Sequence, residues 1–255
     1  MSRVREFIKS FIFRQHALRK VGVGYCAHNG LLPEVLVKTP SKSLREMFGL
    51  PFNEHVSQLN QDVFALLVNK FKQGFFVEIG ANDGFNLSNT IYLEECFGWN
   101  GILIEANPSY LPELSRRKAV VVNKAVAASD GVFEFVDAGL YGGITSTIDP
   151  THAVHTDNAN KIKIQATTLD KILREHHAPR DINFISIDVE GGELPIVEQM
   201  CALKEYRFLS GCIEHNFRQK EYEAFKTLLN AAGYKVVWEG QTCHDLFFVD
   251  DRTGW

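Results

Sequence analysis

Short apolar runs alternate with amphipathic stretches from residue 57 to the end of the chain. The short runs have the length of buried strands, and stretches with apolar residues three or four positions apart have the pattern of helices. Strands are expected at residues 75–79, 101–104, 119–122, 132–136, 162–166, 182–187, 208–213, 234–238 and 246–249. Helices are expected at residues 61–71, 88–97, 111–118, 168–176, 193–203 and 222–232.

This alternation predicts an α/β fold, a doubly wound and mostly parallel sheet with helices on both faces. The expected strands are apolar along nearly their whole length, which is typical of parallel strands that are buried on both faces. The last two strands are joined by about seven residues, too few for a parallel crossover. An antiparallel pair is therefore expected at the C-terminal end.

The first 56 residues have a different character and are expected to be a basic N-terminal extension of a domain that spans residues 57–255. Residues 1–50 hold nine Lys or Arg and three Glu, a balance of +6. An apolar stripe that includes Phe7, Phe11 and Leu18 is flanked by basic residues, which predicts an amphipathic helix within residues 1–20. Such a helix packs on its own domain, packs on a second subunit in a homodimer, or contacts an anionic membrane surface as a peripheral anchor.

Composition excludes several classes of protein. Hydrophobic residues make up 45% and charged residues 23%, so the chain is neither fibrous nor wholly disordered. The 205 residues after residue 50 carry a balance of −10, which argues against nucleic acid as a partner. No apolar run approaches the ~20 residues of a membrane span, and no cleavage site marks a secretory signal. The five cysteines form no C-x-x-C pair, so reduced thiols and a cytoplasmic location are expected.

The most informative motif is Phe-Val-Glu-Ile-Gly-Ala-Asn-Asp-Gly at residues 76–84, between a strand and a helix. Its glycines allow a tight turn and a close approach to a ligand, but their spacing is not the dinucleotide-binding G-x-G-x-x-G. Glu78 and Asp83 would repel a pyrophosphate and accept a cationic ligand. Glu105 ends the next strand, where an acid commonly binds ribose hydroxyls. The features together predict a nucleoside without phosphates, and S-adenosylmethionine (SAM) fits. The residues expected to bind this cofactor are Glu78, Gly80, Asn82, Asp83, Gly84, Ser88, Glu105 and Ala106.

A second group of polar residues follows two later strands, and its members are Asp188, Glu190, Glu214 and His215. Strand ends at one edge of an open α/β sheet form its binding sites, so this group is expected to act on the methyl acceptor. His215 is the expected general base, with Glu190 and Glu214 as alternatives if burial raises their pKa. Asp188 would orient the substrate or SAM. The same side chains could instead hold Mg²⁺ or Mn²⁺, or only accept backbone hydrogen bonds.

The sequence resembles the FkbM family of SAM-dependent methyltransferases. The matching positions are Ser57, Gln58, Gln61, Asp62, Gly233, Tyr234 and residues 76–84, 87–90, 98–107, 187–193 and 214–216. The resemblance implies a seven-stranded class I, Rossmann-like fold and O-methylation of a hydroxyl, usually on a sugar of a surface polysaccharide or a secondary metabolite. The acceptor is then a small molecule or a glycan. A non-catalytic SAM-binding or interaction protein, held at a membrane or complex by its N-terminus, is the alternative.

Several other polar positions are open between a functional and a structural interpretation. Gln58 and Asp62 cover the cofactor or lie on a solvated helix surface. The turn-rich loop that starts at Tyr141 binds substrate or is a plain loop, and the pair His244 and Asp245 faces the substrate or does not. The remaining histidines considered lack metal-site spacing and are expected at the surface; they are His152, His155, His176 and His177.

Overall fold

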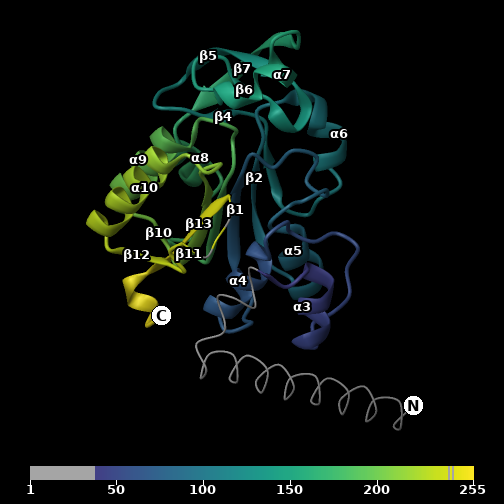
Figure 1. The fold of residues 1–255 in the computed structure, drawn as a ribbon, viewed down its shortest axis with the longest axis vertical. Helices are drawn as coiled ribbons and strands as arrows, with labels where there is room; N and C mark the ends of the chain where they lie inside the picture. Colours follow the sequence, from purple (N-terminus) through teal and green to yellow (C-terminus); the bar gives the residue numbers. More distant parts are fainter. Residues whose placement is uncertain (1–37, 241, 243) are drawn as a thin grey trace.

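The computed structural model describes residues 38–240, 242 and 244–255 and is built on one seven-stranded sheet (Figure 1). Its order is β12-β13-β11-β9-β1-β2-β3, and neighbours are parallel except at β13, which runs antiparallel to both β11 and β12. The predicted mostly parallel sheet with an antiparallel C-terminal pair is thus confirmed. The strands are β1 (Phe75–Ile79), β2 (Asn100–Ile104), β3 (Val120–Val122), β9 (Phe184–Ile187), β11 (Ser210–Glu214), β12 (Tyr234–Val237) and β13 (Asp245–Asp250).

Helices cover both faces of this sheet, which explains why its strands are apolar throughout. Side chains alternate along β1, so Phe76 packs into one core and Val77 into the other. The first core is covered by α3 (Ser41–Met47), α4 (Gln61–Val68), α5 (Ile91–Phe97) and α6 (Leu111–Leu114). The second is covered by α8 (Leu169–Glu175), α9 (Glu193–Ala202) and α10 (Gln219–Ala231).

Two expected strands are each divided in the structure. The expected strand at 182–187 is split by Asn183 into β8 (Asp181–Ile182) and β9. The side-chain oxygen of Asn183 accepts the N–H of Phe75 at 2.8 Å, which ties this break to the start of β1. The expected strand at 208–213 likewise becomes β10 (Arg207–Phe208), which pairs with β8, and β11, which pairs with β9.

Several expected helices are shorter than predicted, among them the one at 61–71, which ends at Val68. The helix expected at 88–97 begins at Ile91, because the hydroxyls of Ser88 and Thr90 donate to the carboxylate of Glu78 and hold the preceding residues in a loop. The helix expected at 111–118 ends at Leu114. Arg117 then turns inward to a buried ion pair with Glu94 at 3.2 Å.

A second sheet lies between β3 and β9 in the chain and covers the carboxyl ends of the main strands, at the top of Figure 1. It contains both additional strands that the sequence predicts and two that it does not. Its order is β4-β7-β5-β6, with Phe135 and Ile164 in its own small core. The helical turns η3 and α7 connect β6 to β7. Its elements are β4 (Ala125–Val126), β5 (Gly131–Asp137), β6 (Gly143–Ile144), η3 (Pro150–His152), α7 (Ala153–Thr156) and β7 (Asn160–Thr167).

The described part of the predicted N-terminal extension packs on the domain. Leu44 and Phe48 are fully buried in the core that also contains α4 and α5, so residue 57 does not separate two packing units there. The helix expected within residues 1–20 lies outside the described residues, and the membrane and homodimer hypotheses stay predictions. In the ranges that the structure describes, every helix is too short or too polar to serve as a membrane span.

Candidate active site

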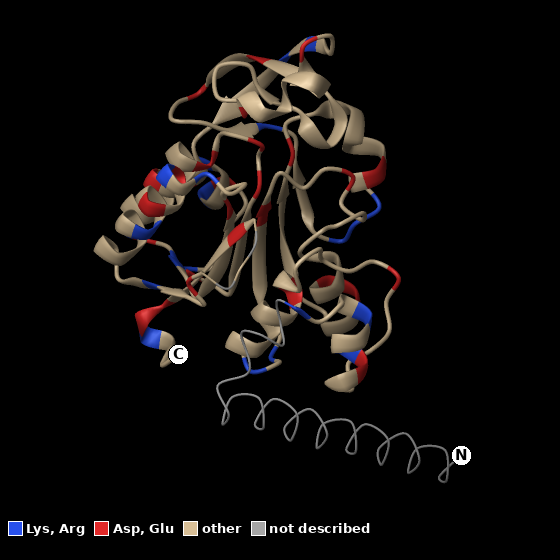
Figure 2. Ribbon diagram, viewed as in Figure 1, with Lys and Arg blue, Asp and Glu red and all other residues tan. Residues whose placement is uncertain are grey.

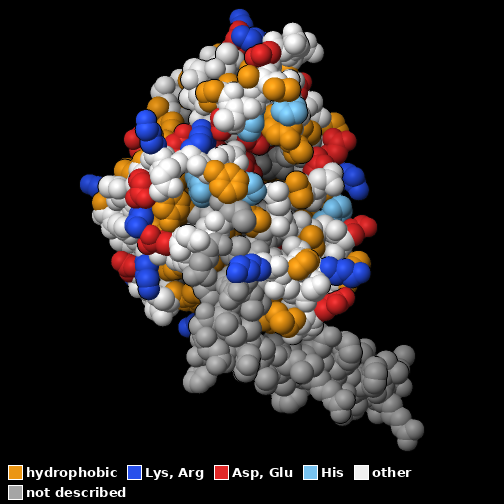
Figure 3. Space-filling model, viewed as in Figure 1, with side chains coloured by type: hydrophobic (Ala, Val, Ile, Leu, Met, Phe, Trp, Pro, Cys, Tyr) orange, Lys and Arg blue, Asp and Glu red, His pale blue; other side chains and the backbone are white. Residues whose placement is uncertain are grey.

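A cavity of about 410 Å³ opens at the carboxyl edge of the main sheet, beneath the second sheet. This volume is in the range of small-molecule sites. Figure 2 shows acidic residues near the upper ends of the central strands, and Figure 3 shows the hollowed face with histidine and hydrophobic side chains on it. Most of the predicted site residues line the cavity: Glu78, Gly80, Asn82, Ser88, Glu105, Ala106, Asp188, Glu190 and Glu214.

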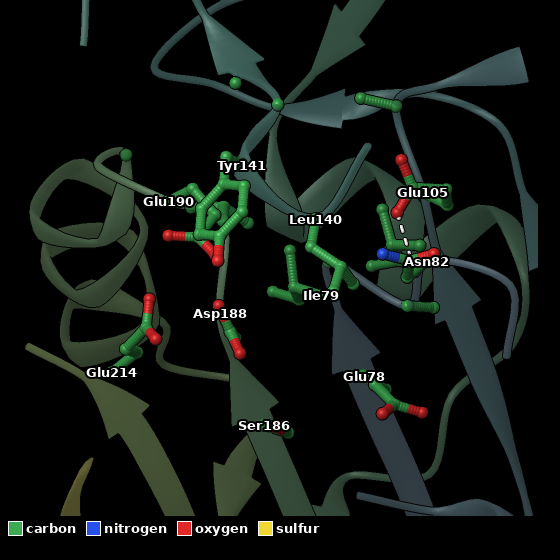
Figure 4. Close-up of a pocket in the computed structure, with 18 of the residues that line it drawn as sticks. Glu78, Ile79, Asn82, Glu105, Leu140, Tyr141, Ser186, Asp188, Glu190 and Glu214 are labelled. Carbon is green, nitrogen blue, oxygen red and sulfur yellow. Dashed lines mark hydrogen bonds between the residues drawn. The ribbon is translucent and has the colours of Figure 1, made fainter. Parts of the chain in front are cut away.

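Glu105, at the tip of β2, holds the loop that follows β1. Its carboxylate accepts the backbone N–H groups of Asn82 at 2.8 Å and Asn107 at 2.7 Å. Burial raises the pKa of Glu105 to about 7, although these N–H donors oppose the shift. Asn82 and Glu105 lie together on one side of the cavity in Figure 4. A carboxylate fixed in this way keeps acceptor sites for ligand hydroxyls.

The carboxylate of Glu78 is used mainly to hold the loop at residues 88–90. Its carboxylate accepts hydrogen bonds from the hydroxyls of Ser88 and Thr90 and from the N–H of Asn89, and burial raises its pKa. Asn89 also donates from Nδ2 to the hydroxyl of Ser186 at 2.8 Å, while its buried Oδ1 has no hydrogen-bond partner among the described residues. Asn89 lines the cavity, although its Oδ1 is shielded from solvent. The sequence analysis missed this residue, because nothing local distinguishes Asn89 from its polar neighbours.

The glycines of the motif serve the chain itself. Gly80 has φ of +84°, and a Cβ there would lie 1.6 Å from the carbonyl oxygen of Asp188. The close approach of the β1 and β9 tips therefore requires a glycine here, and since Gly80 also lines the cavity, its expected approach to a ligand stays a prediction. Asp83 and Gly84 are not among the cavity residues. The carboxylate of Asp83 accepts the N–H groups of Phe85 and Asn86 at 2.8 Å and forms the turn.

Three carboxyl groups meet on the opposite side of the cavity from Glu105 (Figure 4). Asp188, Glu190 and Glu214 each offer an oxygen within 4.8 Å of the others. Burial and repulsion from neighbouring carboxylates raise the pKa of all three, and that of Glu190 reaches about 8. Oxygens at this spacing suit a divalent cation, and the Mg²⁺ or Mn²⁺ hypothesis stays a prediction.

His215 does not line the cavity, although the sequence analysis chose it as the base. Neighbouring side chains at the end of β11 point in opposite directions, so Glu214 and Asn216 face the cavity and His215 does not. The His215 ring packs edge-on against Tyr222, with 5.2 Å between centroids, and burial lowers its pKa.

The polar positions left open by the sequence are now placed. Gln58, Tyr141, His244 and Asp245 line the cavity, whereas Asp62 is buried in an ion pair with Arg45.

The structure also places His152 differently from the sequence analysis. It was expected at the surface, yet it lines the cavity, and its side chain is only 14% exposed. Its Nδ1 lies 3.4 Å from Oε2 of Glu190. The second sheet brings these two residues together, and no local signal in the sequence announces their contact.

A family model described as the methyltransferase FkbM domain matches residues 78–236, more than half of the chain. No curated protein matches the sequence. Among solved structures, methyltransferase FkbM from Methylobacillus flagellatus KT is 11% identical with a TM-score of 0.42, over 88% of this chain and 60% of that chain. An O-methyltransferase from Bacillus cereus in complex with SAH is 14% identical with a TM-score of 0.40, over 87% of this chain and 96% of that chain.

Proposed function

The chain belongs to the FkbM methyltransferase family and has a class I methyltransferase fold, and from this premise we propose that it moves a methyl group from SAM to a sugar hydroxyl. The sugar would be part of a glycan or a secondary metabolite. One observation carries the proposal: a single cavity joins the Glu105 loop on one side to three half-buried carboxyl groups on the other. The Glu105 loop suits a nucleoside, and the three carboxyl groups suit a hydroxylated acceptor.

The residues on the Glu105 side fit SAM. Glu105 would accept the ribose hydroxyls, and the apolar side chains of Ala106, Phe135 and Leu140, which also line the cavity, would contact the base. The acidic lining favours a ligand that carries a sulfonium and an ammonium group.

The other side supports a sugar as acceptor. Carboxyl groups bind several hydroxyls at once, and Asp188, Glu190 and Glu214 lie close enough to share one ring. The Tyr141 ring lines the same part of the cavity and is 37% exposed, so it offers an apolar surface to the C–H face of a sugar.

Holding the acceptor oxygen in line with the methyl group would supply much of the rate acceleration. When bound, SAM supplies the electrophilic methyl carbon. The chain's own residues orient the hydroxyl, exclude water beneath the second sheet and receive the proton. Since His215 lies outside the cavity, we assign acceptor binding to Asp188, Glu190 and Glu214.

Two measurements test this function. Calorimetry with SAM and with S-adenosylhomocysteine (SAH) should show saturable binding of both by the full chain. Tritium from methyl-labelled SAM should then appear in a panel of free, nucleotide-linked and polymeric sugars. Binding without transfer to any sugar in the panel would favour a binding protein over a sugar O-methyltransferase. Failure of both ligands to bind would contradict the assignment of the cavity.

A further inference from the structure

We propose that His152 is the group that takes the proton of the acceptor hydroxyl, and that Glu190 orients its ring. This inference rests on the proposed methyl transfer and deepens it. It assigns the base to the segment that connects β6 to β7 in the second sheet, rather than to the end of a strand in the main sheet.

The two ends of the His152 ring have different surroundings. Nδ1 is buried and lies 3.4 Å from Oε2 of Glu190, an ion-pair distance without the alignment of a hydrogen bond. His152 lines the cavity with a side chain that is 14% exposed, while its Nδ1 is buried. Catalytic hydrogen bonds are often long in the absence of substrate and tighten when it binds. A proton on Nδ1, directed at Glu190, leaves Nε2 free to accept a proton from the cavity.

Backbone contacts hold the His152 segment against the Glu190 loop. The N–H of Asp149 donates to the carbonyl oxygen of Glu190 at 2.9 Å. These two segments of the chain approach so closely that a Cβ added at Gly191 would lie 2.3 Å from the carbonyl oxygen of Thr147. Glu190 itself has φ of +58°, a conformation that residues other than glycine rarely adopt. A strained backbone of this kind persists where its surroundings hold it firmly, as at functional sites.

Side chains complete the support of this junction. Arg218 lies 3.4 Å from a carboxylate oxygen of Asp149 and 3.2 Å from one of Glu193, and so joins the second sheet's connection to the start of α9. The Tyr141 ring packs edge-on against His152, with 5.0 Å between centroids. His152 is therefore positioned before any ligand binds, as a base requires.

The other groups in this part of the cavity are less suited to the role. Asp188 and Glu214 belong to the group of carboxyls to which acceptor binding is assigned. His244 also lines the cavity, and its ring packs against Phe217 with 4.6 Å between centroids. Among the described histidines of the cavity wall, His152 is the one with a carboxylate at ion-pair distance.

The step balances without a further reactant. The acceptor oxygen forms a bond to the methyl carbon while the carbon–sulfur bond breaks, and its electron pair stays on sulfur to give neutral SAH. The hydroxyl proton passes to Nε2 of His152. The resulting imidazolium is stabilised by Glu190 on its other side, which is a carboxylate once the pH exceeds its raised pKa of about 8.

A spectroscopic test examines the pair without any acceptor. In the full chain with ¹⁵N-labelled histidine, the signal lost in His152→Asn identifies His152. At about pH 9, above the raised pKa of Glu190, we expect the ring proton on Nδ1, and Glu190→Gln should shift the population away from that tautomer. A ring protonated on Nε2, or one insensitive to Glu190→Gln, would overturn the proposal.

A kinetic test examines the chemistry. With saturating SAM, His152→Asn and His152→Gln should slow tritium transfer about 10²–10⁴-fold, the usual effect of a lost base, and should bind SAH normally. His155 provides the matched control, because its ring stacks on the same Tyr141 at 4.0 Å but does not line the cavity. His155→Asn should keep kcat within about threefold of the wild type.

The outcomes of the two tests separate the two hypotheses. If the wild type transfers methyl groups and both His152 variants match it, the base assignment is wrong and the proposed function stands. If the wild type modifies no sugar, the proposed function fails, and the tautomer measurement still decides whether His152 and Glu190 form the pair.

Discussion

The carboxylate of Glu105 accepts the backbone N–H of Asn82 at 2.8 Å, so the tip of β2 holds the loop that follows β1. The same carboxylate lines the cavity. One residue thus shapes the loop and faces the ligand, and both effects must be separated when Glu105 is changed.

Glu105→Ala should weaken SAM and SAH binding about 10–150-fold, because a hydrogen bond to a charged group contributes about 1.5–3 kcal/mol. Glu105→Gln should lose less, since its amide oxygen can still accept the Asn82 N–H. Calorimetry measures both constants. The exposed Glu113→Ala, on the neighbouring helix α6, should bind as the wild type does. An unchanged dissociation constant in folded Glu105→Ala would remove Glu105 from the cofactor site.

Gly80→Ala should destabilise the fold strongly, because the new Cβ would collide with the backbone carbonyl of Asp188. Gly240 is a matched control, since its φ is +70° and a Cβ there meets nothing within 4 Å. Gly240→Ala should cost only the roughly 1–2 kcal/mol of the left-handed conformation. Urea unfolding compares the two. Equal losses would show that the tips of β1 and β9 move apart easily.

The free energy of unfolding should depend on pH through Glu190. Burial raises its folded pKa to about 8, so the folded protein binds a proton that the unfolded chain releases near pH 4.5. The stability that this proton gives is fully present below the unfolded pKa and is lost as pH rises through about 8.

The Glu190→Gln variant cannot titrate, so it should lose less stability than the wild type between about pH 5 and about pH 9 in urea unfolding. Glu223→Gln, at an exposed position of α10, should follow the wild type. If all three proteins lose the same stability over this range, the proton on Glu190 does not contribute.

Chelation should leave methyl transfer unchanged if His152 removes the proton and the three carboxyl groups bind the acceptor. Activity assays with and without EDTA measure this directly, and SAH calorimetry in the same buffers controls for loss of cofactor binding. Loss of activity that Mg²⁺ or Mn²⁺ restores would show instead that Asp188, Glu190 and Glu214 hold a cation, which would act on the acceptor oxygen as a Lewis acid.

The sequence alone determined the architecture and one half of the candidate site. Strand and helix periodicities are local, so the alternation of elements, the parallel sheet and the antiparallel end were all readable from hydrophobic positions. The loop at residues 76–84 and Glu105 were readable too, because adjacent parallel strands place their carboxyl ends at one edge. The strand expected at 182–187 is interrupted in the structure, and a tertiary hydrogen bond between Asn183 and Phe75 accompanies the break.

Only the tertiary structure decided the other half. His152 lies in η3 of the second sheet's connection and Glu190 follows β9 of the main sheet, so their contact depends on how the second sheet docks over the main one. The opposite directions of His215 and Asn216 depend on how β11 ends, and the need for Gly80 depends on the position of Asp188 in β9's tip. Such contacts join residues far apart in the chain, so hydrophobic periodicity and motif spacing carry no signal for them.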